Sequence, residues 1–342
     1  MTERRPGPRL LAAALAASAL AVLAACGGQP AAPASDAAAG PAVALANCDR
    51  ETRVDAPPQR AVAISQPAIE LLLTLGLAER MVGAAGFNDP VLPSLRAENA
   101  KVPQLGQQYP SFERVLATEP DFVYTTFAYG FSDEGTAPRE RFERLGVATY
   151  LSPSECGGED AEQTDRLTFD DVFAEVGEIA RIFDVRQRGR ELVASLRRRL
   201  ATATGGLDAD GVSLAWWYAG TKAPYIAGCC GAPGMITERL GATNAFDDSR
   251  QLWPETSWEA ILERDPDVLV LADLTRGGDG DSAEAKIRFL ETDPVARHLS
   301  AVRHRRYVTV TASDMDPSLR NVDAVEKVAT GLRRAQLPRS RP

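Results

Sequence analysis

The chain has 342 residues, of which 44% are hydrophobic and 25% are charged, and its formal net charge is −9. This length suits two domains with packed cores, and the acidic balance argues against a nucleic-acid-binding protein, which needs a surplus of Lys and Arg. Only two histidines are present, which excludes a histidine-rich metal cage and leaves little material for Ser-His-Asp chemistry.

Residues 1–25 have the features of an export signal. Three arginines precede an apolar run over residues 10–23, as in a secretory signal peptide, and the run is too short to cross a bilayer core of about 30 Å. The segment 23–26 (LAAC) resembles a bacterial lipoprotein box, in which the cysteine, here Cys26, becomes the lipidated first residue. The alternative is an ordinary signal peptide whose Ala-rich end contains a cysteine.

Residues 26–50 are predicted to form a lipidated, flexible tether. From Gly27 to about Asn47 the chain is mostly Ala, Pro, Gly and Ser, a composition that has little to bury. We therefore expect an exported protein that the lipid on Cys26 holds at the outer face of the cell membrane, with no other membrane contact.

Four further cysteines predict two disulfides, because an even count in an exported chain favours pairing. The candidates are Cys48, Cys156, Cys229 and Cys230. A bond between the neighbours Cys229 and Cys230 would need a strained peptide, so we expect each of them to pair elsewhere. A redox or metal role for this pair has no second cluster to support it.

The segment 51–167 is predicted to be an N-terminal α/β lobe, because short apolar runs alternate with helical segments. We expect strands over Ala61–Ile64, Val82–Ala85, Phe122–Thr125 and Val147–Leu151, and helices over Ile69–Leu77 and Arg139–Leu145.

Residues 168–204 carry no strand signal and are predicted to be a connecting helix. Apolar residues recur at spacings of three and four, which is helical periodicity. The pattern Thr168-x-x-Asp171 is typical of a capping box, and the sequence allows a break near Asp184.

The segment 205–338 is predicted to be a C-terminal α/β lobe. Strands are expected over Val212–Trp217, Val268–Leu271 and Tyr307–Val310, and helices over Met235–Leu240 and Ala283–Phe289.

The two lobes contain the same helix–strand unit. Residues 111–124 (SFERVLATEPDFVY) align with residues 257–270 (SWEAILERDPDVLV). Ser111 and Ser257 suit helix N-caps, and each apolar run suits a buried parallel strand. The fold class that follows is α/β, with two similar doubly wound lobes joined by a single long interdomain helix.

Aromatic residues gather in loops near the ends of the predicted strands, where open α/β sheets bind ligands. Rings make stiff walls for a bulky, partly apolar ligand. The candidates are Tyr109, Phe127, Tyr129, Trp217, Tyr218, Tyr225 and Trp253. Trp216 and Trp217 point to opposite faces of a strand, so one of them belongs to the core, and other rings equally suit core packing.

Arg276 and Arg320 are the basic candidates at the cleft edge. Guanidinium forks suit the oxygens of anionic ligands, although each arginine equally suits a surface salt bridge. With only two histidines in the chain, we expect no metal ligand from the protein and no cofactor.

As a set, these features resemble the substrate-binding proteins of ABC importers for ferric siderophores, haem and vitamin B12, which are class III periplasmic binding proteins with one interdomain helix. The likeness covers about residues 52–335. Beside the repeat, the motifs that carry it are Pro58–Ile64, Glu70–Leu77, Arg80–Gly83, Gln104–Gly106, Leu145–Val147, Leu240–Asn244 and Arg297–Arg303.

The resemblance implies a monomeric receptor that binds an iron–siderophore complex between its lobes and delivers it to an ABC permease. In this family one glutamate on each lobe reaches permease arginines, and the matching positions are Glu113 and Glu259; the alternative is that each only caps its helix. Cobalamin or haem is the alternative cargo, and an exported interaction lipoprotein without cargo is a further one. An enzyme is not expected, because no G-x-S-x-G, H-E-x-x-H or P-loop motif is present.

Overall fold

The computed structural model describes residues 42–158 and 162–335 of the chain. The predicted signal peptide, Cys26 and most of the predicted tether lie outside this part. Residues 43–50, which we expected to belong to the tether, instead form most of an antiparallel hairpin of β1 (Val43–Asn47) and β2 (Arg50–Val54). Alternate residues of β1 are buried. This is the pattern of a strand that packs one face against the protein and exposes the other.

The first lobe is built on a five-stranded parallel sheet in the order β5-β4-β3-β6-β7. Its strands are β3 (Ala61–Ile64), β4 (Met81–Ala85), β5 (Gln104–Gly106), β6 (Phe122–Thr125) and β7 (Ala148–Leu151). Its helices are α1 (Gln66–Thr74), α2 (Arg96–Asn99), α3 (Phe112–Leu116) and α4 (Arg139–Glu143). Every residue of β3 and β6 is buried, as expected for parallel strands covered on both faces.

The second lobe has a sheet in the order β10-β8-β11-β12, all parallel, with β9 antiparallel to β8. Its strands are β8 (Ser213–Ala219), β9 (Tyr225–Ile226), β10 (Thr243–Asn244), β11 (Val268–Asp273) and β12 (Tyr307–Thr311). Its helices are α7 (Ala232–Arg239), α8 (Trp258–Arg264), α9 (Ala283–Thr292), α10 (Ser300–Arg303), α11 (Ala312–Met315) and α12 (Asn321–Arg334). The fold class of two α/β lobes with parallel sheets is therefore confirmed.

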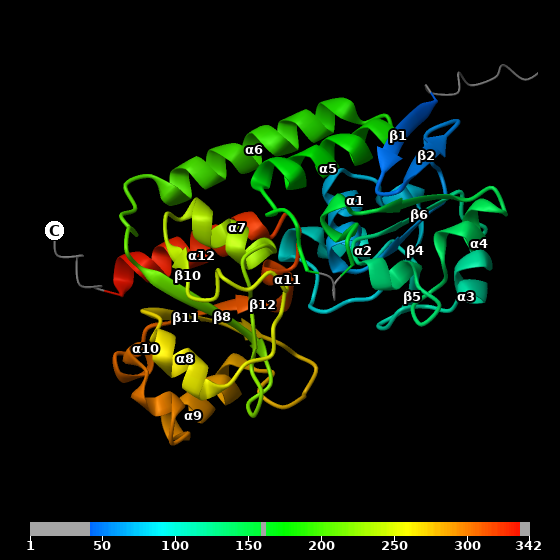
Figure 1. Ribbon diagram of the computed structural model, residues 1–342. Helices are drawn as coiled ribbons and strands as arrows, with labels where there is room; N and C mark the ends of the chain where they lie inside the picture. Colours follow the sequence, from blue (N-terminus) through cyan, green and yellow to red (C-terminus); the bar gives the residue numbers. More distant parts are fainter. Residues whose placement is uncertain (1–41, 159–161, 336–342) are drawn as a thin grey trace, which may run out of the picture. The chain divides into compact units, whose positions relative to one another are not determined.

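The connecting segment 168–204 forms two helices, α5 (Phe169–Ile182) and α6 (Arg186–Thr204), which run side by side (Figure 1). Asp184 has a φ of 54°, and this left-handed residue ends the first helix and reverses the chain. The expected capping box is present at the start of α5.

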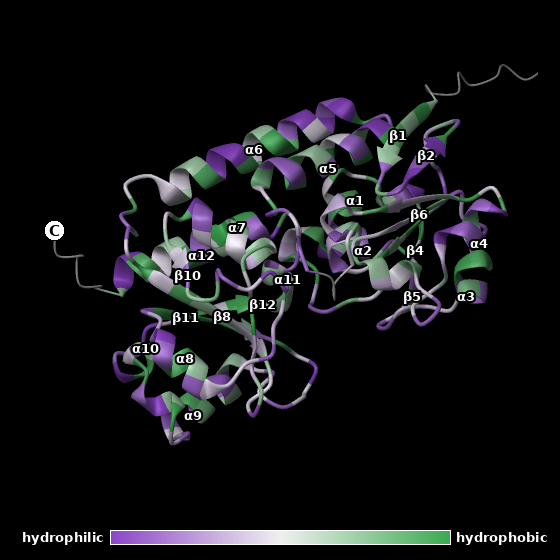
Figure 2. Ribbon diagram, viewed as in Figure 1, coloured by the Kyte–Doolittle hydropathy of each residue, from purple (hydrophilic) through white to green (hydrophobic). Residues whose placement is uncertain are grey.

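Both connecting helices contribute to the cores of both lobes. Phe173 of α5 and Leu196 of α6 pack in the second lobe, whereas Val176 and Ile179 of α5 pack in the first. Purple and green bands alternate along α6 in Figure 2, because this helix buries only one narrow face.

An ion pair and a second polar contact join the lobes directly. Arg320 donates to Glu70 through Nε at 2.7 Å and through Nη2 at 2.5 Å, and both side chains are about 95% buried or more. Ser313 donates to Asp89 through its amide at 2.8 Å and its hydroxyl at 2.6 Å. We call these four residues the interlobe clasp.

The disulfides differ from the expected pairing. Cys48 is bonded to Cys156, which fastens the turn between β1 and β2 to the segment after β7. Cys229 is bonded to its neighbour Cys230, so the expectation that each pairs elsewhere is wrong. The reason is topological: both residues are buried before α7 in the second lobe, whereas the hairpin brings the other two cysteines together in the first.

Candidate functional site

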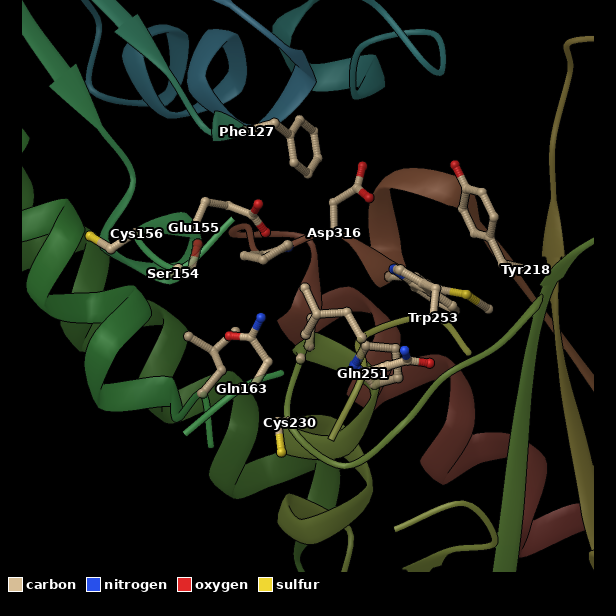
Figure 3. Close-up of a pocket in the computed structure, with 18 of the residues that line it drawn as sticks. Phe127, Ser154, Glu155, Cys156, Gln163, Tyr218, Cys230, Gln251, Trp253 and Asp316 are labelled. Carbon is tan, nitrogen blue, oxygen red and sulfur yellow. The ribbon is translucent and has the colours of Figure 1, made fainter. Parts of the chain in front are cut away.

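A cavity of about 900 Å³ lies between the two lobes and the segment that connects them. Its wall includes loops at the carboxyl ends of parallel strands, as open α/β sheets predict. Phe127 follows β6, Tyr218 lies near the end of β8, and Asp316 follows β12 and the short helix α11. Figure 3 shows side chains from both lobes turned toward this space.

Seven of the nine predicted ligand-binding residues line the cavity. They are Tyr109, Phe127, Tyr129, Tyr218, Tyr225, Trp253 and Arg276. The rings form two groups: Tyr109 packs edge-on against Tyr129 with centroids 5.1 Å apart in the first lobe, and Tyr218 packs against Trp253 at 5.0 Å in the second. Each lobe thus contributes one pair of packed aromatic rings to the cavity wall.

Trp217 does not line the cavity, which corrects one predicted site residue. It is fully buried in the core and packs edge-on against Trp258 with centroids 4.8 Å apart. Trp216, on the opposite face of β8, is fully buried as well, and its Nε1 donates to Thr237. Both rings are internal because β8 is a central strand whose two faces are covered.

Arg320 is the second correction, because the interlobe clasp occupies its guanidinium and it is absent from the cavity wall. Arg276 does line the cavity, but it is bonded to Asp281 at 2.8 Å and lies 5.5 Å from the Tyr218 ring centroid. The hydrogen bond with Asp281 raises the pKa of the Arg276 guanidinium further above its usual value.

Sequence reasoning missed the acidic part of the wall. The lining carboxylates are Glu155, Glu162, Asp165, Asp171 and Asp316. Glu155 comes directly after β7, and Asp316 comes shortly after β12. Both residues follow strands that the sequence predicted. Because the carboxyl ends of parallel strands converge on the binding site, this position could have identified them as wall residues.

The wall formed by residues 163–167 is hydrogen-bonded to the second lobe. The Gln163 amide donates to the Arg250 carbonyl at 2.9 Å, and the Arg250 side chain donates back to the Gln163 carbonyl at 2.8 Å. The Leu167 amide donates to the Cys230 carbonyl at 2.9 Å. These hydrogen bonds attach residues 163–167 to the part of the second lobe that contains the Cys229–Cys230 disulfide.

A buried carboxyl group lies behind the cavity wall. Glu175 of α5 accepts hydrogen bonds from the Tyr124 hydroxyl at 2.6 Å and the Ser152 hydroxyl at 2.8 Å. Burial raises the pKa of Glu175 to about 7, although both hydrogen bonds oppose the shift. The same burial raises the pKa of Tyr124 well above its ordinary value.

The two predicted transporter-docking glutamates occupy equivalent positions. Ser111 accepts from the Arg114 amide and caps α3, and Ser257 accepts from the Ala260 amide and caps α8. Glu113 and Glu259 are each the second residue of their helix, and both are exposed. Each is favoured there by the positive end of the helix.

Metal-binding side-chain clusters and membrane-spanning helices are both absent from the described part of the chain. Within residues 42–158 and 162–335, no group of three or more His, Cys, Asp or Glu side chains is placed to hold a metal ion. In that part of the chain, too, no helix combines the length and the apolar character needed to span a bilayer. His298 and His304 are both exposed.

Comparison with known proteins places this geometry in context. Residues 62–313 match the family described as periplasmic binding protein. The vitamin B12-binding protein of Vibrio cholerae serotype O1 is 25% identical over 286 residues, which cover 82% of this chain and 91% of that protein.

Two solved structures share the fold over most of their length. A periplasmic binding protein from Veillonella parvula superposes with a TM-score of 0.75 at 25% identity, covering 85% of this chain and 97% of that one. An ABC-type Fe3+-hydroxamate transport system protein from Saccharomonospora viridis gives a TM-score of 0.71 at 28% identity, covering 84% and 98%.

Proposed function

This chain belongs to the periplasmic binding protein family, and we propose that it captures a ferric siderophore between its lobes and delivers it to an ABC importer. The observation that carries the proposal is the cavity of about 900 Å³, which has an aromatic wall on each lobe. This volume is within the range of ligand sites, about 300–1,000 Å³. It suits a chelate that brings its own metal ligands.

The aromatic walls favour a hydroxamate-type chelate. Such a complex presents an apolar ligand backbone around a polar metal centre, and Tyr and Trp rings contact the former while their hydroxyl and indole groups reach the latter. The likeness to the Fe3+-hydroxamate transport protein of Saccharomonospora viridis supports the same class of cargo.

Delivery would use the paired glutamates. Glu113 and Glu259 are exposed on equivalent capped helices, so together they offer a bipartite acidic footprint to basic residues of a permease. The permease and the small-molecule cargo are the partners that this role requires.

Lipid attachment at Cys26 is a further part of the proposal, and it rests on the lipoprotein-box resemblance of residues 23–26. A Cys26→Ala variant should leave the membrane fraction while binding cargo with unchanged affinity. Membrane association that survives this substitution would contradict the anchor, and an intact Cys48–Cys156 disulfide would show that the variant was exported and folded.

Vitamin B12 is the second candidate cargo. The specific observation in its favour is the 25% identity to the Vibrio cholerae vitamin B12-binding protein over 82% of this chain. The same transport role would then apply to a corrin.

Tryptophan fluorescence titration separates these cargoes, because Trp253 lies in the cavity wall. We expect saturable quenching at micromolar or lower concentration by a ferric hydroxamate, and weaker responses to ferric catecholates, ferric citrate, haem and cobalamin. The iron-free hydroxamate is the control. Binding of cobalamin alone would replace the siderophore assignment, and a chain that binds no member of the panel would refute the cargo role.

A pair of alanine variants tests whether the cargo contacts the predicted wall. Trp253→Ala should weaken ferric-hydroxamate binding at least about tenfold, because truncation of an aromatic hot-spot residue costs about 2 kcal/mol or more. Leu145→Ala, at a 59% exposed position that is not in the cavity wall, is the matched control and should bind as the parent does. Equal affinities in a calorimetric titration would place the cargo elsewhere.

A further inference from the structure

We propose that Ser154 is a specificity-determining residue of the cavity, and that its hydroxyl group donates a hydrogen bond to the cargo when Glu175 is protonated and can only accept one when Glu175 is ionised. This inference rests on the proposed function, because it concerns the same cavity and the same class of cargo. It makes cargo binding depend on pH through a carboxyl group that the cargo does not touch.

The first observation is a series of hydrogen bonds that leads from a buried carboxyl group to the cavity. The Ser152 hydroxyl donates to Glu175 at 2.8 Å, and the hydroxyl oxygens of Ser152 and Ser154 are 2.8 Å apart. Glu175 and Ser152 are buried, whereas Ser154 is half-buried and lines the cavity. Figure 3 shows Ser154 on the same side of the cavity as Glu155 and Cys156. We call Glu175, Ser152 and Ser154 the hydroxyl path.

The second observation is that the fold holds both ends of the hydroxyl path. Glu175 belongs to α5, Ser152 directly follows β7, and Ser154 lies in the short turn 153–155 that packs against α5. The Tyr124 hydroxyl donates to Oε1 of Glu175 at 2.6 Å, whereas Ser152 contacts Oε2. Because Oε1 already accepts this hydrogen bond, a proton on the carboxyl group lies on Oε2, the oxygen that faces Ser152.

The charge state of Glu175 therefore sets the direction of every hydrogen bond in the hydroxyl path, because each serine has one proton to donate. When Glu175 is ionised, Ser152 donates to the carboxylate, Ser154 donates to Ser152, and only lone pairs of Ser154 are left for the cavity. When Glu175 takes up a proton from solvent, its O–H donates to Ser152, Ser152 donates to Ser154, and the Ser154 proton turns to the cavity. The change needs only the rotation of two hydroxyl groups.

The surroundings of Glu175 place this change near neutral pH. Burial raises the pKa of Glu175 to about 7, against the opposing effect of the hydrogen bonds from Tyr124 and Ser152. The like charge of Glu178, one turn later on α5, contributes to the increase. Tyr150 of β7 donates to Glu178 at 2.5 Å and not to Glu175.

Within residues 42–158 and 162–335, no basic side chain forms an ion pair with Glu175. Arginines of α6, which packs against α5, contact other groups: Arg197 pairs with Asp170, and Arg188 donates to carbonyl groups at the C-terminal end of α1. The other acids on the elements around Glu175 are Asp171 of α5 and Glu155 of the turn 153–155.

A donating hydroxyl suits the proposed cargo. The metal-bound oxygens of a ferric hydroxamate accept hydrogen bonds and have no proton to give, so the Ser154 proton attracts them and its lone pairs repel them. We therefore expect tighter binding when Glu175 is protonated. By linkage, bound cargo then favours the protonated form of Glu175.

The Kd of N-acetyl ferrioxamine B at two pH values tests the proposal, because this neutral ferric trihydroxamate has no group that titrates between about pH 5.5 and about pH 8.5. We expect the Kd of the parent to be about threefold to tenfold lower at the acidic value, which is the worth of one hydrogen bond. Equal affinities at the two pH values would overturn this inference and leave the siderophore role standing. Failure to bind the probe at either pH would overturn the proposed hydroxamate cargo and this inference with it.

Glu175→Gln separates the hydroxyl path from a merely structural role. The amide oxygen of glutamine accepts from Tyr124 and its amide nitrogen donates to Ser152, as the protonated acid does. This variant should therefore bind the probe at about pH 8.5 as tightly as the parent does at about pH 5.5. Binding at about pH 8.5 that is no tighter than that of the parent would contradict the proposal.

Ser154→Ala tests the other end of the hydroxyl path at a half-buried position. It should lose the parent's pH ratio and bind at about pH 5.5 no more tightly than the parent does at about pH 8.5. The matched control is Glu178→Gln, which changes an acid of α5 that contacts Tyr150 and is not in the wall, and it should keep the ratio.

Lys286 is a second buried group that titrates in this range, because burial lowers its pKa to about 8. It donates to the Asp281 carbonyl, near Arg276 of the wall, and it is unchanged in every variant. A pH ratio that persists undiminished in both Glu175→Gln and Ser154→Ala would therefore belong to another group and would overturn the inference.

Discussion

The helix–strand unit of the first lobe, α3 and β6, has its counterpart in α8 and β11 of the second lobe. In both, a serine caps the helix, an exposed glutamate is the second helical residue, and a buried parallel strand follows. The features that would face a permease are thus repeated.

The loops that face the cavity are not repeated. The first lobe has an N-terminal hairpin tied to its sheet edge by the Cys48–Cys156 disulfide. The second lobe instead has the short antiparallel strand β9 and the bond between neighbouring cysteines before α7. Under the proposed function, the repeated unit is the surface offered to the transporter, whereas the binding loops differ because they fit one asymmetric cargo.

Replacement of Glu113 and Glu259 removes a feature that the two lobes share, and it has the largest expected effect on uptake. We expect Glu113→Gln with Glu259→Gln to reduce uptake at least about a thousandfold, because each lost charge pair at an interface costs about 2–5 kcal/mol, while the cargo Kd stays unchanged. Transport of radiolabelled iron in cells checks this.

The matched control for that variant is Glu119→Gln with Glu263→Gln, which removes two exposed carboxylates from the same units. Uptake by the control should equal that of the parent. A loss of cargo affinity in the first variant, or equal loss of uptake in both, would refute the docking role.

Removal of Arg320 tests how firmly the two lobes are joined. Arg320→Leu should lower the free energy of unfolding by about 3–5 kcal/mol, because it leaves the buried Glu70 carboxylate without its cation. The double variant with Glu70→Leu should recover part of this loss. Urea unfolding is the measurement, and a loss below about 1 kcal/mol, or strictly additive losses, would show that the clasp does not couple the lobes.

The two disulfides should differ in their contribution to stability, which sharpens the contrast between the lobes. Cys48 and Cys156 are 108 positions apart, whereas Cys229 and Cys230 are neighbours. Since the entropy removed from the unfolded chain grows with loop length, replacement of the first pair by serine should cost about 2–4 kcal/mol and replacement of the second much less. Equal losses in thermal unfolding would contradict this ranking.

Glu175 gives the first lobe a pH dependence that can be isolated with one substitution. Its pKa is about 7 in the folded chain against an ordinary value of 4.5, so its contribution to stability is complete below about pH 4.5 and is lost as the pH rises through 7. Glu175→Gln should therefore be more stable than the parent by about 3 kcal/mol near pH 8.5 and equal to it near pH 4. Parallel stability curves for the two proteins would disprove the assignment.

In the two parallel sheets, the sequence predicted the strands of four residues or more well and missed the shorter ones. The ranges expected for β3 and β6 match the structure residue by residue, because continuous apolar runs are needed where both faces are covered. The edge strands β5, β9 and β10 have two or three residues each, too few for any periodic pattern. Helix α12 was also missed, although its apolar residues recur with helical spacing.

The aromatic part of the site was predictable and its charge was not. Rings after strand ends were identified from their position in the chain, since the carboxyl edge of a parallel sheet is a general binding edge. Whether a basic residue reaches that edge depends on its partners. Arg320 turns to Glu70, which is 250 positions away and is brought close only by the fold. Arg276 turns to Asp281, which is five positions further along the same loop.

Anomalous diffraction at the iron absorption edge, from crystals grown with a ferric trihydroxamate, tests the central claim most directly. We predict a single iron peak inside the cavity between Phe127 and Trp253, with the chelator supplying every iron ligand. An iron atom bonded to a protein side chain, or a peak outside the space between the lobes, would contradict the account of a receptor that holds a preformed complex.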